Sequence, residues 1–206
     1  MKKIALFIGL LIVSLGMAQQ NYEKGMRKAF LSWKEGNIAE AVNMFERISV
    51  AEPDNWLPFY YVAQINTIRS FGEKEEHTLK QQLDTAQEFL DIAKAISTRN
   101  PEILVQQAML YTAWIAFDGA TYGMSLSGKV ASLYAEALQL APENPRVVFS
   151  KAQWDMGTAT YFGKDTAPYC ADVARSLQLF ATFKPASEFH PNWGQERAEA
   201  ILETCE

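Results

Sequence analysis

An asparagine followed eight residues later by an alanine recurs along the chain, and this pattern most constrains its fold. The five pairs are Asn21 with Ala29, Asn55 with Ala63, Asn100 with Ala108, Asn144 with Ala152, and Asn192 with Ala200. Asparagine is a strong helix N-cap because its side-chain oxygen accepts from free backbone N–H groups of the first turn. An alanine two turns later lets a neighbouring helix approach closely. Five similar helix starts predict a repeat protein, which typically binds along a surface rather than catalysing at a point.

The distance from Asn21 to Asn55 is 34 residues, which is the length of a tetratricopeptide repeat. Within it, Ala41, Phe45 and Pro53 stand where that family carries its A-x3-F…P pattern. Proline ends the second helix because it has no N–H to donate. The chain therefore resembles the tetratricopeptide repeat family, strongly in this repeat and more loosely over the rest of the mature chain. The resemblance implies an all-α solenoid of antiparallel helix pairs with a C-terminal capping helix.

The later intervals between the asparagines are 45, 44 and 48 residues, so each later repeat is longer than the first. We expect one domain, residues 19–206, with repeats at about 21–54, 55–99, 100–143 and 144–191 and a capping helix at 192–206. The extra length is expected between the two helices of a repeat, in segments 71–77, 118–123 and 156–164. Such insertions would emerge on one edge of a solenoid, often the binding edge. The alternative is that the flanking helices are simply longer.

The N-terminal residues indicate export. Two lysines precede an apolar run from Ile4 to Leu15, and a small-x-small site, Gly16 to Ala18, follows. This pattern predicts a signal peptide over residues 1–18, cleaved after Ala18. The run is too short to span a bilayer core of ~30 Å, so no transmembrane segment is expected after cleavage. No cysteine follows the run, which excludes bacterial-type lipidation there. We therefore expect a periplasmic or secreted protein; the alternative is a short uncleaved anchor.

The charge balance limits the partners of the mature chain. Removing the two lysines of the signal peptide takes the basic residues from 19 to 17, against 24 acidic ones. Nucleic acids and anionic lipid surfaces attract basic proteins, so neither is expected as a partner. Hydrophobic residues make up 49% of the chain, enough for one continuous helical core.

One segment comes close to a catalytic motif. Residues 123–129 satisfy the GxxxxGK pattern of a phosphate-binding loop, yet Val130 stands where a hydroxyl should hold magnesium, and a helix rather than a strand is expected before it. The chain has two histidines, His77 and His190, and no HExxH, GxSxG or CxxC motif. The two cysteines and two histidines lack the paired spacing of a zinc site. We therefore expect no catalytic residues, no metal and no cofactor.

The family resemblance also implies a binding groove. In tetratricopeptide proteins the first helix of each repeat lines a concave surface, and the matching positions here carry mostly apolar and amide side chains. These positions are Met26, Phe30 and Trp33; Tyr60, Gln64 and Thr67; Val105, Met109 and Thr112; and Phe149, Gln153 and Met156. The basic residues with which some members bind a peptide carboxylate are missing from this set. The alternative is that several of these side chains are core residues covered by the inserted segments.

The resulting hypothesis is an exported scaffold or adaptor that binds a protein or peptide in this groove. The main alternative is a small-ligand-binding protein whose pocket is closed by the glycine-rich inserted segments. That alternative would bury Trp114, Tyr122, Trp154 and Tyr161 around a cavity. An enzyme of unknown class is a third hypothesis and would need titratable residues inside such a cavity. These patterns determine neither the identity of the partner nor the oligomeric state.

The two cysteines of the chain predict a disulfide bond between Cys170 and Cys205. Disulfides persist outside the cytoplasm, and an even count of two leaves no odd thiol. Cys170 is expected at the start of a helix at about 169–183, and Cys205 at the end of the next helix, which starts near Trp193. Antiparallel packing of two consecutive helices of similar length brings these two ends together. The alternative is two unpaired, buried thiols.

Overall fold

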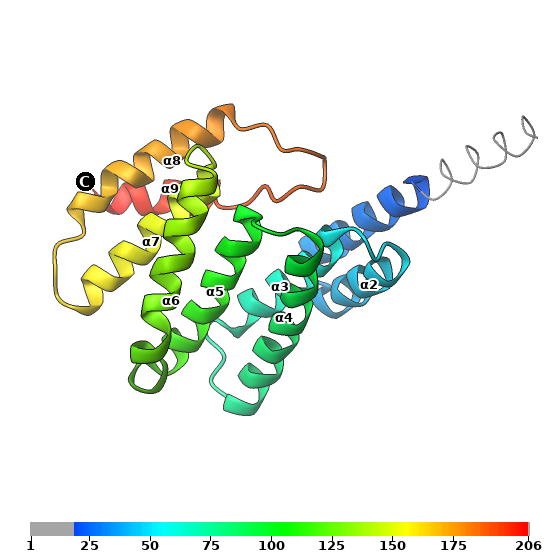
Figure 1. The fold of residues 1–206 in the computed structure, drawn as a ribbon, viewed down its shortest axis with the longest axis horizontal. Helices are drawn as coiled ribbons and strands as arrows, with labels where there is room; N and C mark the ends of the chain where they lie inside the picture. Colours follow the sequence, from blue (N-terminus) through cyan, green and yellow to red (C-terminus); the bar gives the residue numbers. More distant parts are fainter. Residues whose placement is uncertain (1–18, 206) are drawn as a thin grey trace, which may run out of the picture.

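The computed structural model describes residues 19–205, and these residues form an all-α fold without a β-strand (Figure 1). A helix runs through residues 19–34. It is followed by α2 (Ile38–Ala51), α3 (Trp56–Ser70), α4 (Glu76–Ile96), α5 (Pro101–Phe117), α6 (Gly119–Leu140), α7 (Pro145–Tyr161), α8 (Cys170–Thr182) and α9 (Gln195–Leu202). A short 3-10 turn at Ala167–Tyr169 precedes α8, and a second one at Glu203–Cys205 ends the described chain. No helix within this range is long and apolar enough to cross a membrane.

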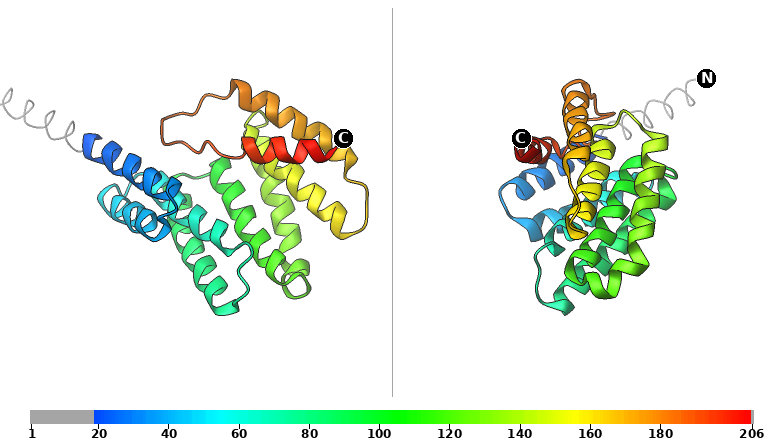
Figure 2. Two further views of the ribbon diagram at one scale, coloured as in Figure 1. Left: turned by 180° about the vertical axis from the view of Figure 1, so that it is seen from behind. Right: turned by 90° about the vertical axis from the view of Figure 1, so that its left-hand side faces the viewer.

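Consecutive helices pack in antiparallel pairs, as expected for an all-α solenoid. The most extensive contacts are between α5 and α6 and between α3 and α4. The pairs stack side by side, and α9 lies against α8 at one end of the stack (Figure 2). The predicted signal peptide, residues 1–18, lies outside the described residues.

Three of the five asparagines act as the predicted N-caps. The side chains of Asn55, Asn100 and Asn144 accept from the backbone N–H two residues ahead, at 3.1, 2.9 and 3.0 Å. The other two predictions are wrong: Asn21 lies inside the first helix, and Asn192 lies in a non-helical segment before α9. That segment packs against an earlier repeat through Trp193, which donates to the Tyr60 hydroxyl, and the helix begins only after Gly194.

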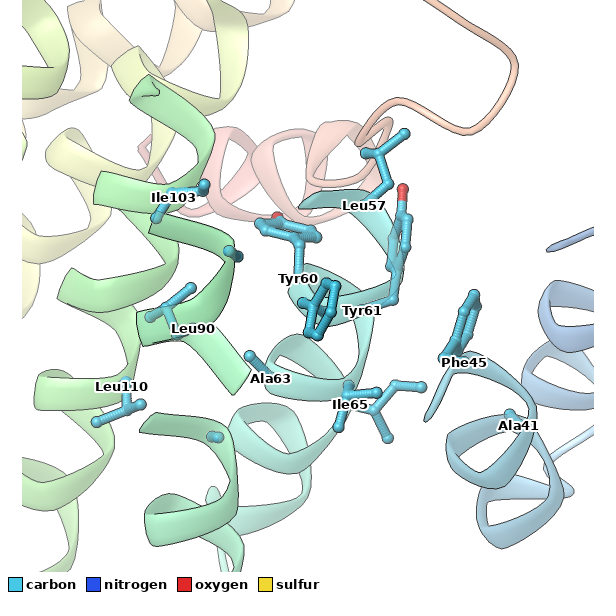
Figure 3. Packing of buried hydrophobic residues seen from close by; sticks show 14 of the residues in the cluster. Ala41, Phe45, Leu57, Tyr60, Tyr61, Ala63, Ile65, Leu90, Ile103 and Leu110 are labelled. Atoms are coloured by element: carbon cyan, nitrogen blue, oxygen red, sulfur yellow. The ribbon is translucent and has the colours of Figure 1, made fainter. Parts of the chain in front are cut away.

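The alanines that lie eight residues after these asparagines pack as predicted in the first four repeats. Ala29, Ala63, Ala108 and Ala152 are at most 1% exposed, which matches their expected role at helix contacts. The fifth, Ala200, is exposed. In Figure 3, Ala63 of α3 faces the aromatic and aliphatic side chains of the largest core cluster, which includes Phe45, Tyr60 and Leu90.

The predicted insertions turn out to be partly helical. Phe71–Glu75 forms a loop between α3 and α4, but α6 begins at Gly119, so segment 118–123 is a tight corner followed by helix. Asp118 caps that helix by accepting from the backbone N–H of Thr121 at 3.0 Å. Helix α7 continues to Tyr161, so most of segment 156–164 is also helix. The extra residues therefore mainly lengthen the flanking helices, and all three segments lie along the same edge of the stack, the lower edge of Figure 1.

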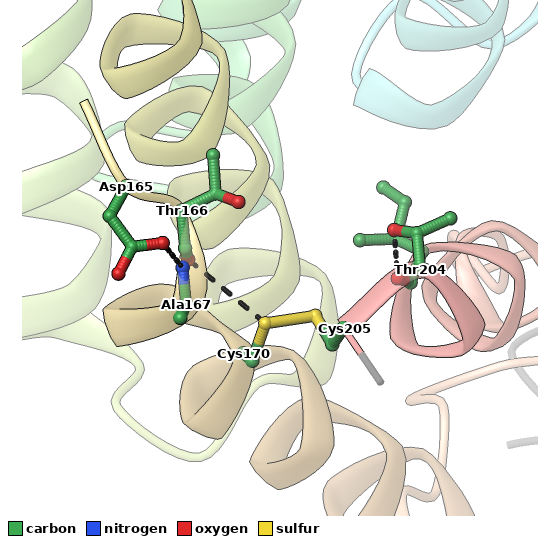
Figure 4. Close-up of a disulfide and its surroundings, with 7 residues drawn as sticks. Asp165, Thr166, Ala167, Cys170, Thr204 and Cys205 are labelled. Carbon is green, nitrogen blue, oxygen red and sulfur yellow. Dashed lines mark hydrogen bonds between the residues drawn. A yellow bond between two sulfur atoms is a disulfide. The ribbon is translucent and has the colours of Figure 1, made fainter. Parts of the chain in front are cut away.

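Cys170 and Cys205 form the predicted disulfide bond, with their Cα atoms 5.9 Å apart (Figure 4). The bond joins the start of α8 to the turn that follows α9, which fits the antiparallel arrangement of these two helices. It therefore holds the last helix of the described chain against the stack.

Replacing both cysteines with serine is expected to lower the free energy of unfolding by about 2–4 kcal/mol, because the bond closes a long loop in the unfolded chain. Urea denaturation of the oxidised protein and of the Cys170→Ser/Cys205→Ser variant measures the difference. Chemically reduced wild-type protein is the matched control and should resemble the variant. Equal midpoints for all three samples would contradict a stabilising role of the bond.

Candidate functional site

The connection between α8 and α9, residues 183–194, crosses to the N-terminal half of the molecule, and we call it the strap. Arg27 binds Glu188 through two hydrogen bonds of 2.9 and 2.7 Å. Tyr61 donates its hydroxyl to the Phe189 carbonyl at 2.7 Å. The Phe189 ring is 5% exposed and lies 6.1 Å from the Phe30 ring, centroid to centroid. The strap is therefore an integral part of the first core cluster.

The second half of the strap covers the first turn of α3. The His190 ring packs edge-on against Trp56, with centroids 5.7 Å apart. Trp193 donates its indole N–H to the Tyr60 hydroxyl at 3.0 Å. Gly194 ends the strap with a φ of +106°, and a Cβ atom there would lie only 3.3 Å from the Phe180 ring. Only glycine combines this backbone conformation with this close approach.

A buried ion pair lies beneath the strap. Glu102 of α5 and Arg146 of α7 are 1% and 0% exposed, and the guanidinium donates to the carboxylate at 2.8 and 2.5 Å. Asn144 also donates to Glu102, at 2.6 Å, and the Phe183 ring lies 4.6 Å from the guanidinium carbon. Each charged residue stands two positions after an N-cap asparagine, so the regular stacking of repeats brings them side by side. Burying this pair costs hydration energy, which its hydrogen bonds offset.

A pocket of about 580 Å³ opens between the α6–α7 turn, the end of α8 and the strap. Its wall is mixed, with apolar and polar side chains in equal number: Ala141, Pro142, Glu143, Asn144, Leu179, Thr182, Phe183, Lys184, Ala186 and His190. We call it the His190 pocket. The volume of this hollow lies within the range of small-molecule sites.

His190 joins the pocket to the buried ion pair. Its side chain is 21% exposed, and its Nε2 atom lies 4.0 Å from a carboxylate oxygen of Glu102. Burial lowers the pKa of His190 below its usual value; the Glu102 carboxylate opposes this shift, and Arg146 adds to it. The imidazole is therefore neutral near pH 7, which is the form that binds metals.

The predicted groove residues divide into two groups. Met26, Tyr60, Gln64, Thr67, Val105 and Phe149 are buried, whereas Phe30, Trp33, Met109, Thr112, Gln153 and Met156 are partly exposed. An open groove requires that Tyr60 and Phe149 be exposed, and this expectation is wrong, because the two side chains are 0% and 1% exposed. Trp193 of the strap and Trp56 cover Tyr60, and Phe149 belongs to a core cluster with α8 and α9.

The aromatic residues of the alternative hypothesis do not gather around one cavity. The Trp114 and Tyr122 rings are in contact, with centroids 4.9 Å apart. Trp154 packs on the second core cluster, and Tyr161 is 75% exposed. The GxxxxGK segment, residues 123–129, lies inside α6, so its backbone N–H groups do not form a phosphate-binding loop.

Comparison with known proteins supports the fold. No protein-family model matches the sequence, and no curated protein matches it. Among solved structures, the HusA haemophore from Porphyromonas gingivalis matches with a TM-score of 0.78, over 90% of this chain and 92% of that chain, at 23% sequence identity. The two chains share a fold. At this identity the likeness concerns the fold alone, and the tetratricopeptide resemblance rests on the residues of the first repeat.

Sequence reasoning missed the most connected part of this site. The sequence-based hypothesis gives neither histidine a role, and it divides the strap between the last repeat and the capping helix. One signal in the sequence could have indicated the buried ion pair. Glu102 and Arg146 each stand two residues after an N-cap asparagine, a position at which α3 carries the apolar Leu57. Opposite charges at equivalent positions of neighbouring repeats predict a pair.

Proposed function

We propose that this chain is an exported small-ligand-binding protein of tetratricopeptide-like fold, and that it binds haem or a related tetrapyrrole in the His190 pocket. The observation that carries the proposal is a neutral, partly exposed histidine in the wall of a pocket that combines apolar and polar side chains. Histidine is a common axial ligand of haem iron. The shared fold with a haemophore supports the same ligand class.

The residues around His190 fit such a ligand. Leu179 and Phe183 offer apolar contact to a porphyrin face, and the Lys184 ammonium could bind a propionate. The Glu102 carboxylate lies 4.0 Å from Nε2, which is beyond hydrogen-bond distance, so its negative charge rather than a hydrogen bond would favour a proton on Nε2 and leave Nδ1 for iron. The ligand is cargo in this proposal, and no catalytic role is proposed.

A peptide-binding groove is less well supported, because the strap covers Tyr60 and binds Tyr61. A peptide would have to displace a segment whose Phe189 is part of the core. The export part of the proposal rests on the pattern of residues 1–18, outside the described range, and N-terminal sequencing of the native protein tests it.

Titration of the mature protein with haemin is expected to give saturable one-to-one binding with a shifted Soret band. The His190→Ala variant should bind haemin at least about tenfold more weakly, a loss of ~1.4 kcal/mol, because the iron ligand is removed. His77→Ala is the matched control, since His77 is exposed at the start of α4 and lies outside the pocket. Iron-free protoporphyrin should bind wild type and His190→Ala alike, which separates iron ligation from pocket filling.

Haemin that fails to saturate, or that binds His190→Ala as tightly as wild type, would rule out this site. Equal losses of haemin affinity in His77→Ala and His190→Ala would show that haemin binds histidines non-specifically rather than in the His190 pocket. Circular dichroism of each variant excludes unfolding as the cause.

A further inference from the structure

A second hollow lies at the opposite edge of the helix stack from the His190 pocket. It has a volume of about 340 Å³ and lies between the α3–α4 loop and the end of α5. The loop contributes Ser70, Phe71, Gly72, Glu73 and Lys74, and α5 contributes Ala113, Ala116 and Phe117. Because α5 and α6 are antiparallel, they end at opposite edges of the stack, and the end of α6 borders the His190 pocket (Figure 1). The proposed function makes no use of this hollow.

Small residues leave the space open, and aromatic residues form its walls. Gly72 has a φ of +86°, and no atom lies within 4 Å of the place where its Cβ would stand. Ala113 and Ala116 are three residues apart and therefore share a face of α5. Phe71 is 41% exposed and Phe117 is partly exposed. Water-exposed phenyl rings beside an unfilled space gain free energy when an apolar group covers them.

The lining of this hollow carries one charge of each sign, on Glu73 and on Lys74. The neighbouring Glu73 carboxylate is held by the loop itself, because it accepts from the backbone N–H groups of Lys74 and Glu75 at 2.8 and 3.0 Å. The ion pairs found within residues 19–205 do not include Lys74. The ammonium group is therefore available to an anion that enters the hollow.

We propose that this hollow, the α3–α5 pocket, binds an amphiphilic monocarboxylate, such as a medium-chain fatty acid. The alkyl chain lies over Ala113 and Ala116 between Phe71 and Phe117, and the carboxylate pairs with Lys74. The volume is near the lower end of the range for small-ligand sites, roughly 300–1,000 Å³, which suits a single chain better than a tetrapyrrole. This site is independent of the His190 pocket, and the proposal does not depend on haem binding.

Calorimetric titration with octanoate tests the proposal, with 1-octanol as the uncharged probe of the same length. Both probes should bind saturably. Lys74→Gln should weaken octanoate binding by about two- to fivefold, the value of an exposed ion pair, and leave octanol unchanged. Ala116→Leu should weaken both probes, because the added side chain fills the hollow from an exposed position. Ala120→Leu is the matched control, since Ala120 is exposed on α6 outside the lining, and should weaken neither.

No saturable octanoate binding, or binding that Ala116→Leu leaves intact, would overturn the proposal. Loss of octanoate binding in protein saturated with haemin would also overturn it, because the two sites would then be one. Binding of octanoate without binding of haemin would support the α3–α5 pocket and contradict the proposed function. The failure of one proposal can therefore be told from the failure of the other.

Discussion

Replacing Glu102 with alanine is expected to lower the free energy of unfolding by about 3–5 kcal/mol. Arg146 is 0% exposed, and without the carboxylate its charge would remain buried without a counter-ion. Asn144 would also lose the acceptor of its side-chain amide. Urea denaturation followed by circular dichroism measures the change.

Two further variants identify the cause of this loss. Replacing both charged residues with apolar ones, as in Glu102→Leu/Arg146→Met, should lower the free energy of unfolding much less than Glu102→Ala does, because no charge is then left buried alone. Glu188→Ala is the surface control: its pair with Arg27 is more than half exposed, so we expect a loss below ~1 kcal/mol. If Glu102→Ala were as mild as Glu188→Ala, the buried pair would have no structural role.

Replacing Phe189 with alanine is expected to destabilise the protein by about 3–5 kcal/mol, the usual cost of removing a buried phenyl ring. The ring is 5% exposed and contacts Tyr22 and Phe30 of the first helix. Its removal leaves a cavity and loosens the strap on which His190 lies. Thermal and urea unfolding of Phe189→Ala measure the effect.

Phe162→Ala is the matched control, because Phe162 is 65% exposed in the loop after α7. Its replacement should change the stability by less than ~0.5 kcal/mol. Similar stability of the two variants would mean that the strap is not part of the core. Hydrogen exchange at the strap amides provides an independent readout, with faster exchange expected in Phe189→Ala alone.

The sequence by itself determined the local architecture. Asn55, Asn100 and Asn144 mark the starts of α3, α5 and α7, because an N-cap bond involves only the side chain and an N–H two residues ahead. The disulfide between Cys170 and Cys205 was also predictable, since consecutive antiparallel helices place their opposite ends together. Such features depend on residues that are close in sequence or on neighbouring elements.

Other features followed only from the tertiary structure. The burial of Tyr60 depends on Trp193, which is 133 residues away, so no local pattern separates a groove residue from a core residue there. The same holds for the strap, whose irregular course follows from contacts with the first two repeats rather than from its own helix propensity. The His190 pocket is likewise assembled from the α6–α7 turn, α8 and the strap. Local hydrogen bonds and periodicity specify helices, whereas burial and pockets arise from the sum of distant contacts, which a single sequence does not encode in any local pattern.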